Sequence, residues 1–423
     1  MNAPDLTATP RRRVMLALLT VALTLSHLDR HILAIVLEQI GREFSFNDIQ
    51  LGALSGLSFA VAYGVFGFVA ARFCVPGRRK ALLTGAVACW SLATMGLGAA
   101  VGFASLLFGR IVVGLGEATV MPGSHAMIAD AFPPNRRASA LAIFQAGGNF
   151  GLLLAFVVGG VVAANWGWRT AFVVAGAPGL LVAVCLRIWL HEPAQQEPAP
   201  NGTETPTVTK STALATLGRI RAQASARCAF FGLILASLVN FGGVAWVPTY
   251  LVREHGLALP MVGLYLAVLV GVVGAIGTWL GGLFADRTEA RTLGGSMRFV
   301  AMTLIVAKLG ALWFYALGAS PVALIVLVIP VAFNGIYIAP AMSHVYGYLP
   351  ASQRPMATAI MMFGTNVIGL SLGPVIVGVI SDFSAGSVGS PLGLGLASLQ
   401  FFGIGAAWLF WRAGAYARSE HRS

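Results

Sequence analysis

The sequence predicts an all-α membrane protein whose twelve transmembrane helices form two six-helix halves related by a parallel pseudo-repeat. Three observations predict this fold. Of the 423 residues, 57% are hydrophobic and only 10% are charged, whereas a water-soluble globular protein has about 25% charged residues. Twelve apolar runs are long enough to cross a hydrocarbon core of about 30 Å. Finally, residues of the first half recur in the second half at a nearly constant offset.

The apolar runs fall into two sets of six, separated by a polar stretch. They lie near residues 14–38, 50–72, 81–102, 104–131, 138–163 and 169–190, and then near 228–252, 261–285, 298–318, 321–347, 356–380 and 392–412. The stretch between the sets begins with a run rich in Pro, Gln and Glu that cannot bury a core. We therefore expect five segments: a cytoplasmic tail (1–13), the first half (14–190), a cytoplasmic linker (191–227), the second half (228–412) and a cytoplasmic tail (413–423).

The distribution of basic residues predicts the orientation in the membrane. The net charge is +12, but Lys and Arg occur in short clusters between apolar runs. This pattern is typical of membrane topology and not of a nucleic-acid surface. Twenty-one of the 27 Lys and Arg residues fall on one side of the predicted spans, so both termini are expected in the cytoplasm. Arg11 to Arg13 precede a run that Asp29 and Arg30 interrupt, which favours a retained span over a cleaved signal.

The internal repeat relates the two halves in the same orientation. The pair Arg42-Glu43 recurs 211 residues later as Arg253-Glu254, Gly116 recurs 219 residues later as Gly335, and Asn149 recurs 217 residues later as Asn366. Transporters with parallel repeats bind substrate between the repeats, near the bilayer midplane. We therefore expect a substrate site at that depth.

The charged residues inside the spans belong almost entirely to the first half. A buried carboxylate or guanidinium costs several kcal/mol unless it faces a partner or a water-filled cavity. Arg110 and Glu117 share a helix face, and Arg30 and Glu117 lie at a similar depth. Desolvation and a nearby guanidinium change the proton affinity of a carboxylate in opposite directions. We expect proton coupling at Glu117, with Asp29 as the second candidate; a permanent ion pair from Arg30 or Arg110 to Glu117 is the structural alternative.

The second half replaces these charges with apolar, aromatic and amide side chains. Asp29-Arg30 corresponds to Asn240-Phe241, Arg110 to Ile329 and Glu117 to Ile336. Further candidates for a substrate or charge network are polar or aromatic residues in apolar runs, each of which packing between helices also explains: His31, His125, Asn149, Asn240, Trp246, Asn334, Tyr337, His344 and Asn366. Lys308 is expected to extend its ammonium to the membrane surface; pairing with a substrate anion is the alternative.

No metal or cofactor site is expected. The four cysteines lack metal-ligand spacing, and the chain contains no zinc motif, phosphate loop or nucleophile constellation. The sequence therefore predicts neither an enzyme nor a cofactor-dependent protein.

Two loop motifs resemble those of the major facilitator superfamily. Residues 282–287 (GLFADR) match the family's loop motif, and residues 67–72 followed by 77–80 form its first-half copy. The resemblance implies conformational roles for Gly67, Arg72, Arg78, Arg79, Gly282, Asp286 and Arg287. The first copy has Ala71 where the family has an aspartate. Whether this chain keeps the family's charge-relay lock on the cytoplasmic side is therefore left open by the sequence.

Residues 28–30 (LDR), 109–118 (GRIVVGLGEA) and 131–137 (AFPPNRR) resemble the spinster-like branch of this superfamily. That resemblance implies transport of lysophospholipids or sphingoid phosphates, with coupling on Asp29, Arg30, Arg110 and Glu117. The same residues also resemble the anion-cation symporter branch, which takes up small organic acids. Phe241, Ile329 and Ile336 favour the amphipathic substrate.

The expected function is therefore secondary active transport by alternating access, coupled to protons and moving an amphipathic anion. Import of a small organic acid is the alternative, and a non-transporting membrane sensor or enzyme is a third. The expected partners are the substrate, protons and membrane lipids, with no nucleic acid. A monomer in the bacterial inner membrane is the expectation from the resemblance.

Overall fold

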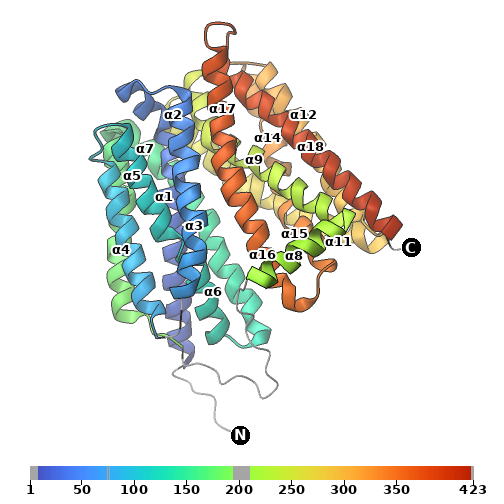
Figure 1. Ribbon diagram of the computed structural model, residues 1–423. Helices are drawn as coiled ribbons and strands as arrows, with labels where there is room; N and C mark the ends of the chain where they lie inside the picture. Colours follow the sequence, from blue (N-terminus) through green and yellow to red (C-terminus); the bar gives the residue numbers. More distant parts are fainter. Residues whose placement is uncertain (1–7, 74, 76, 194–209, 421–423) are drawn as a thin grey trace. The chain divides into compact units, whose positions relative to one another are not determined.

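The computed structural model describes residues 8–73, 75, 77–193 and 210–420 of the chain (Figure 1). Parts of the expected tails (1–7 and 421–423) and of the expected linker (194–209) lie outside these residues. The described residues form helices and connecting turns, with no strand among them. The predicted all-helical class is confirmed.

The first six predicted spans correspond to eight helical segments. These are α1 (Ala8–Phe44), α2 (Asp48–Gly52), the π-helical η1 (Ala53–Leu57), α3 (Ser58–Phe73), α4 (Arg79–Leu97), α5 (Phe103–Glu117), α6 (Val120–Ala131) and α7 (Pro134–Trp189). Helix α7 contains two predicted spans in one run of 56 residues, interrupted at Gly167, whose φ of 82° is left-handed. Glycine adopts this conformation without a steric cost, so the chain bends there between two membrane crossings.

The second half is divided into more segments. They are α8 (Lys210–Ala222), α9 (Ala224–Arg253), α10 (Leu259–Leu266), the π-helical η2 (Ala267–Gly274), α11 (Ala275–Arg291), α12 (Gly295–Ala316), α13 (Pro321–Val326), α14 (Val328–Asn334), α15 (Ile338–Gly347), the short η3 (Ala351–Gln353), α16 (Arg354–Phe363), the π-helical η4 (Gly364–Leu370), α17 (Ser371–Ser384) and α18 (Pro391–Glu420). Helix α8 lies within the expected linker.

Ten helical stretches of the described chain are long and apolar enough to cross a membrane. One of them covers α7 and so accounts for two spans. The predicted span at 50–72 is divided into α2, η1 and α3 and is not among the ten. With these two adjustments the structure accommodates the twelve predicted spans.

The chain forms two compact units, and each takes one short segment from the other predicted half. The first unit contains α1, α3 to α7 and α10, in which α1 and α4 both pack on α7. The second unit contains α2, η1, α8, α9 and the segments from residue 268 onward, in which α18 packs on α9 and α12. The start of the second span and the start of the eighth span therefore belong to a unit other than the one that surrounds them in sequence.

Glycines allow these exchanged segments to pack closely. A Cβ at Gly56 of η1 would lie 2.3 Å from the Leu370 carbonyl oxygen, and one at Gly52 would lie 2.6 Å from that of Pro374. In the first unit, a Cβ at Gly263 of α10 would lie 2.2 Å from the Phe156 carbonyl oxygen. Small residues permit such backbone approach between membrane helices, so each exchanged segment is fitted to its unit.

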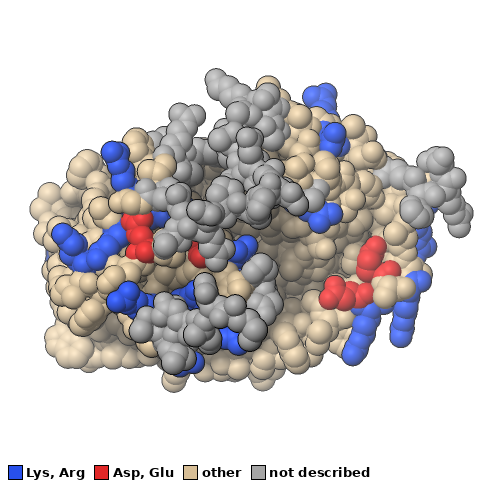
Figure 2. Space-filling view, turned by 90° about the horizontal axis from the view of Figure 1, so that it is seen from below, with Lys and Arg blue, Asp and Glu red and all other residues tan. Residues whose placement is uncertain are grey.

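Basic side chains gather on the face seen from below in Figure 2, together with a smaller number of acidic ones. Basic residues also stand at several helix ends, such as Arg187 in the last turn of α7, Arg291 in that of α11 and Arg418 in that of α18. This distribution is consistent with the predicted orientation, which stays a prediction.

Candidate functional site

The first unit contains a buried group of charged and polar side chains, here called the charged cluster: Ser26, Asp29, Arg30, Arg110 and Glu117. Oε2 of Glu117 accepts hydrogen bonds from Nη2 of Arg30 at 2.8 Å, from Nε of Arg30 at 3.2 Å and from the Ser26 hydroxyl at 2.8 Å. Glu117 is 1% exposed. Arg30 and Glu117, which the sequence places at a similar depth, are thus in contact.

A break in the fourth span positions Glu117. Helix α5 ends at Glu117 and α6 begins at Val120, so the residue stands where the span is interrupted. The Thr119 hydroxyl donates to the Gly116 carbonyl at 3.0 Å and satisfies one backbone acceptor in that turn. Interrupted helices expose backbone and side-chain dipoles and are common at transporter binding sites.

Aromatic rings cover the two guanidinium groups. The Arg30 guanidinium carbon lies 4.6 Å from the centre of the Phe59 ring and 4.8 Å from that of Tyr63, and the Arg110 carbon lies 5.1 Å from the Phe59 ring. Cation–π contacts of this kind become stronger when water is excluded. The α3 aromatics therefore hold both arginines inside the first unit.

Several charged atoms of the cluster have no hydrogen-bond partner among the described residues. They are both carboxylate oxygens of Asp29, Oε1 of Glu117, and Nε and Nη1 of Arg110. Asp29 and Arg110 are each 1% exposed. Buried polar atoms are usually satisfied, and unsatisfied ones mark functional or strained sites. The cluster can therefore still accept protons or bind an anion.

The second unit contains a different polar group, here called the amide cluster: Lys308, Asn334 and Asn240. Nζ of Lys308 donates to Oδ1 of Asn334 at 2.8 Å, and Nδ2 of Asn334 donates to Oδ1 of Asn240 at 2.6 Å. Lys308 is 2% exposed. The expectation that Lys308 reaches the membrane surface is therefore wrong, because the side chain points inward to an amide partner.

The remaining candidates of the first half are dispersed. The ring of His31 lies 6.2 Å from that of His27. His125 is in edge contact with Phe144 at 5.6 Å between ring centres, and its Nε2 has no partner among the described residues. Asn149 is exposed on α7. Of these three side chains, His31 lies close enough to Arg30 and Arg110 to interact with them electrostatically. The roles of all three stay predictions.

Two aromatic candidates of the second half are buried. Trp246 is 0% exposed and its indole donates to the Pro374 carbonyl at 2.8 Å. Tyr337 is 1% exposed and shares a hydrogen bond of 3.3 Å with Ser237. Neither side chain offers a surface to a substrate in this conformation, since both bind other helices of their own unit. Asn366, half-buried in η4, donates to the Met362 carbonyl at the end of the adjoining α16 at 2.8 Å.

The first loop motif is bonded to other parts of the first unit. Gly67 and Arg72 lie in α3, and Arg78 is exposed just before α4. Arg79 forms an ion pair with Asp130 of α6. The backbone N–H groups of Gly77 and Lys80 donate to the Glu192 carboxylate. An acidic side chain that follows α7 thus holds this loop by its backbone.

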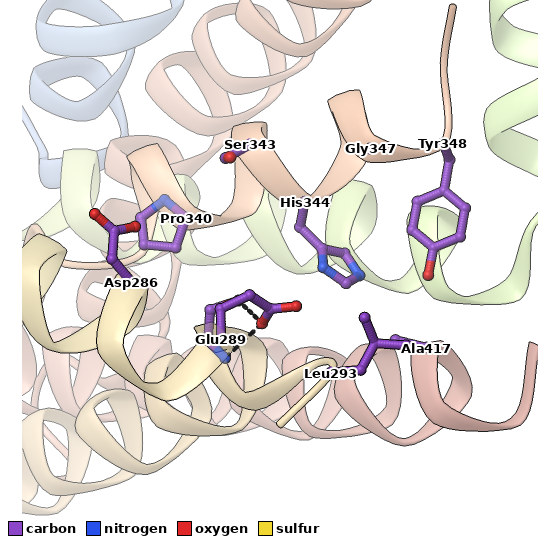
Figure 3. Close-up of a pocket in the computed structure, with 10 residues that line it drawn as sticks. Asp286, Glu289, Leu293, Pro340, Ser343, His344, Gly347, Tyr348 and Ala417 are labelled. Atoms are coloured by element: carbon purple, nitrogen blue, oxygen red, sulfur yellow. Dashed lines mark hydrogen bonds between the residues drawn. The ribbon is translucent and has the colours of Figure 1, made fainter. Parts of the chain in front are cut away.

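The second loop motif borders a pocket of about 380 Å³ in the second unit (Figure 3). Asp286 lies at one end of the pocket and Tyr348 at the other, with His344 between them. Gly282 and Arg287 belong to α11, as Asp286 does. Glu289 accepts from the backbone N–H groups of Gly294 and Ser296, and His344 Nε2 lies 2.8 Å from the Ser225 hydroxyl. The structure thus brings together Asp286 and His344, which were predicted separately.

Sequence reasoning missed one polar network, formed around Asp48 at the start of α2. The Asp48 carboxylate accepts from Arg253 at 2.9 Å and from the Ser381 hydroxyl at 2.6 Å. The Asp382 carboxylate in turn accepts from the backbone N–H groups of Asp48 and Ile49 at 3.0 and 2.9 Å. The repeated Arg253-Glu254 pair was the available signal, but its partner comes from a distant part of the sequence.

The fold and the charged cluster define a polytopic transport protein, and comparison with known proteins identifies its family. Residues 19–374 match the family model of the Major Facilitator Superfamily. The chain belongs to this superfamily of membrane transporters.

The individual relatives differ in the functions that their names state. The chain is 28% identical over 410 residues to an MFS-type efflux pump of Mycolicibacterium smegmatis, covering 95% of this chain and 93% of that protein. It is 26% identical to the hexuronate transporter of Bacillus subtilis, covering 86% of each chain. It is 25% identical to the sphingosine-1-phosphate transporter SPNS2 of Danio rerio, covering 87% of this chain and 76% of that one.

Among solved structures, the fold resembles that of a bacterial homolog of the human lysosomal transporter Spinster, in an inward-facing and unoccupied conformation. The TM-score is 0.81, with 24% sequence identity and 96% of each chain covered. The spinster-like resemblance of the sequence therefore extends to the fold.

Proposed function

We propose that this protein is a proton-coupled secondary transporter of an organic anion, working by alternating access. The observation that carries the proposal is the buried contact of Arg30 with Glu117, next to Asp29 and Arg110. Two carboxylates and two guanidinium groups in one desolvated group are electrically balanced when all are ionised. Protonating one carboxylate leaves an excess positive charge, which an anion neutralises.

This balance gives a mechanism for coupling. A proton on Glu117 weakens the two hydrogen bonds from Arg30 and frees a guanidinium that matches carboxylate or phosphate geometry. Release of the anion leaves the cluster with an excess positive charge. This charge favours ionised Glu117, which then gives up its proton. Asp29 is the second proton carrier, and Arg110 adds positive charge that favours ionised carboxylates.

Two classes of anion are candidates. A lysophospholipid or sphingoid phosphate is supported by the similarity to SPNS2 and by the half-buried Phe241 and Ile329. A small organic acid is supported by the similarity to a hexuronate transporter and by the amide cluster, whose polar groups do not suit an alkyl chain. We further propose a bacterial inner-membrane location with both termini in the cytoplasm and a monomeric state.

The coupling role is tested by transport into proteoliposomes with and without a proton gradient. Glu117→Gln is expected to abolish gradient-driven accumulation and to retain part of the anion exchange, because a neutral amide cannot cycle its charge. Glu38→Gln is the matched control, since Glu38 is a buried acid of α1 that pairs with Arg42 outside the cluster. Full gradient-driven accumulation by Glu117→Gln would remove Glu117 from the coupling role.

A further inference from the structure

The amide cluster begins with a lysine that is buried without an acidic partner among the described residues. No ion pair of the described chain involves Lys308. Its aliphatic stem is tightly packed, since a Cβ at Gly403 would lie 2.7 Å from its Cδ and Cε atoms. A membrane-buried lysine is costly and is usually kept for function. The packing fixes the Lys308 side chain in place. Its ammonium then acts on its surroundings through the hydrogen bond to Asn334.

The donors and acceptors of the cluster determine which way each amide faces. A lysine ammonium has donors only, so the oxygen of Asn334 must face Nζ of Lys308. The Nδ2 group of Asn334 must then face the oxygen of Asn240, which accepts at 2.6 Å. The Nδ2 group of Asn240 then points away from Asn334 and can donate to another acceptor. That group has no hydrogen bond to any described residue.

The exposure of the three side chains places the Nδ2 donor of Asn240 at the accessible end of the amide cluster. Lys308 is buried, whereas Asn334 and Asn240 are half-buried. In a membrane-spanning segment, a partly exposed amide is expected to face a water-filled cavity and not lipid. By the internal repeat, Asn240 also corresponds to Asp29 of the charged cluster, so it occupies the equivalent position on the first helix of its half.

We infer that the amide cluster is a substrate subsite for an oxygen acceptor, with Asn240 as the binding donor and Lys308 as the positioning residue. The occupant is a hydroxyl or second carboxylate oxygen of a small organic acid. This inference rests on the proposed function and narrows its substrate class to a hydroxylated or dicarboxylic acid. The alkyl chain of a lipid phosphate has no acceptor for the Asn240 hydrogen bond, whereas a hydroxylated acid carries acceptor oxygens along its whole length.

The test uses a substitution that preserves the helix contacts and removes only the Nδ2 donor of Asn240. Asn240→Asp keeps an oxygen for Asn334 but replaces the outward N–H group with a second oxygen. Asn165→Asp is the matched control, because Asn165 is an exposed amide of α7 that bonds within its own helix and belongs to neither cluster. The purified protein is titrated with D-glucuronate, with hexanoate, which has the same chain length without hydroxyls, and with 1-oleoyl lysophosphatidate. Affinity is obtained from thermal stabilisation.

Wild-type protein is expected to bind D-glucuronate more tightly than hexanoate. Asn240→Asp should weaken D-glucuronate about tenfold or more, the value of one lost hydrogen bond plus charge repulsion, with little change for hexanoate. Lys308→Met should lower the same preference by releasing the Asn334 amide, and Lys308→Gln, which keeps an N–H donor, should restore part of it. Asn165→Asp should leave the preference unchanged.

Three results would overturn the inference. If Asn240→Asp binds D-glucuronate like wild type, the cluster only joins helices, and the proposed function is unaffected. If 1-oleoyl lysophosphatidate stabilises wild type and D-glucuronate does not, the lipid class of the proposed function is retained and the subsite is rejected. If none of these three anions binds, the proposed transport of organic anions fails together with the subsite.

Discussion

The two halves of this transporter place polar groups at equivalent points but use opposite chemistry. In the first half, the fourth span breaks after Glu117, which is bonded to Arg30. In the second half, the tenth span breaks after Asn334, which is bonded to Asn240 and Lys308. The first half thus buries a group of ionisable side chains, and the second half buries a row of two amides bonded to one lysine.

Under the proposed function, this difference assigns proton coupling to one half of the repeat and substrate recognition to the other. Carboxylates and guanidinium groups can exchange protons and partners, so they suit coupling. Amides carry no charge in either orientation, so they suit recognition that must not change with proton occupancy. The comparison predicts that the two clusters respond differently when their charges are removed.

The largest effect is expected from breaking the charged cluster on one side. Arg30→Met leaves Glu117 with a buried charge and without its principal donor, which typically costs about 3–5 kcal/mol. We expect a large fall in the melting temperature of the purified protein. The double variant Arg30→Met/Glu117→Met should recover most of that loss while staying inactive in transport. Similar stability of the single variant and wild type would contradict a structural contribution from the pair.

The next effect concerns the segment that the second unit takes from the first half of the sequence. Asp48→Asn removes the charge that pairs with Arg253 and the acceptor of Ser381, so α2 should detach more often. A loss of about 1.4 kcal/mol corresponds to about tenfold faster amide exchange in α2, measured by hydrogen exchange with mass spectrometry. Asp130→Asn, which removes the acid paired with Arg79 in the first unit, is the control and should leave α2 unchanged.

A smaller effect is expected from removing the lysine of the amide cluster. Lys308→Met deletes a buried charge that has no acidic partner, so the gain in desolvation offsets the lost hydrogen bond. We expect the unfolding free energy to change by less than about 1 kcal/mol. A loss as large as that of Arg30→Met would show that both halves depend on buried charge, and the contrast drawn above would fail.

The smallest effect is on the pH dependence of stability. It concerns two equivalent positions in the connections that follow the first and the seventh span. Phe44 of the first half corresponds to His255 of the second, which stacks on Phe314 and contacts Tyr250. Burial lowers the pKa of His255 below its ordinary value of 6.5. The unfolded chain therefore binds this proton more readily, and stability falls as the pH drops below about 6.5.

Replacing His255 with phenylalanine, the residue at the equivalent position of the first half, removes this contribution to the pH dependence of stability. His255→Phe should show a smaller fall in melting temperature between pH 7.5 and 5.5 than wild type does. An equal fall in both proteins would assign the acid sensitivity to other groups.

Much of this fold could be predicted from sequence, because the bilayer imposes length and polarity on every span. The apolar runs, the repeat and the resemblance to the major facilitator superfamily all indicated the observed class. The contact of Arg30 with Glu117 could be predicted for the same reason, since the depth of a residue in its span follows from counting residues. The resemblance also indicated which branch of the superfamily the chain is similar to.

Partners from distant spans were not predictable from these patterns. The hydrophobic pattern around Lys308 is that of an ordinary span, and nothing in it shows that the side chain turns inward to Asn334. The burial of Trp246 and Tyr337 likewise depends on which helices pack beside them. The Asp48 network joins residues more than 300 positions apart, and a single sequence without a periodic signal does not reveal such a pairing.

The exchange of short segments between the units has a consequence for biosynthesis. Asp48 is separated from Asp382 by 334 residues, which is about 17 to 67 s of synthesis at about 5–20 residues per second. During that time α2 is outside the ribosome, but the helix that receives it does not yet exist. Its capping box, between Asn47 and Gln50, is local and forms without a distant partner. The first half of this protein therefore cannot reach its final arrangement before nearly the whole chain has been made.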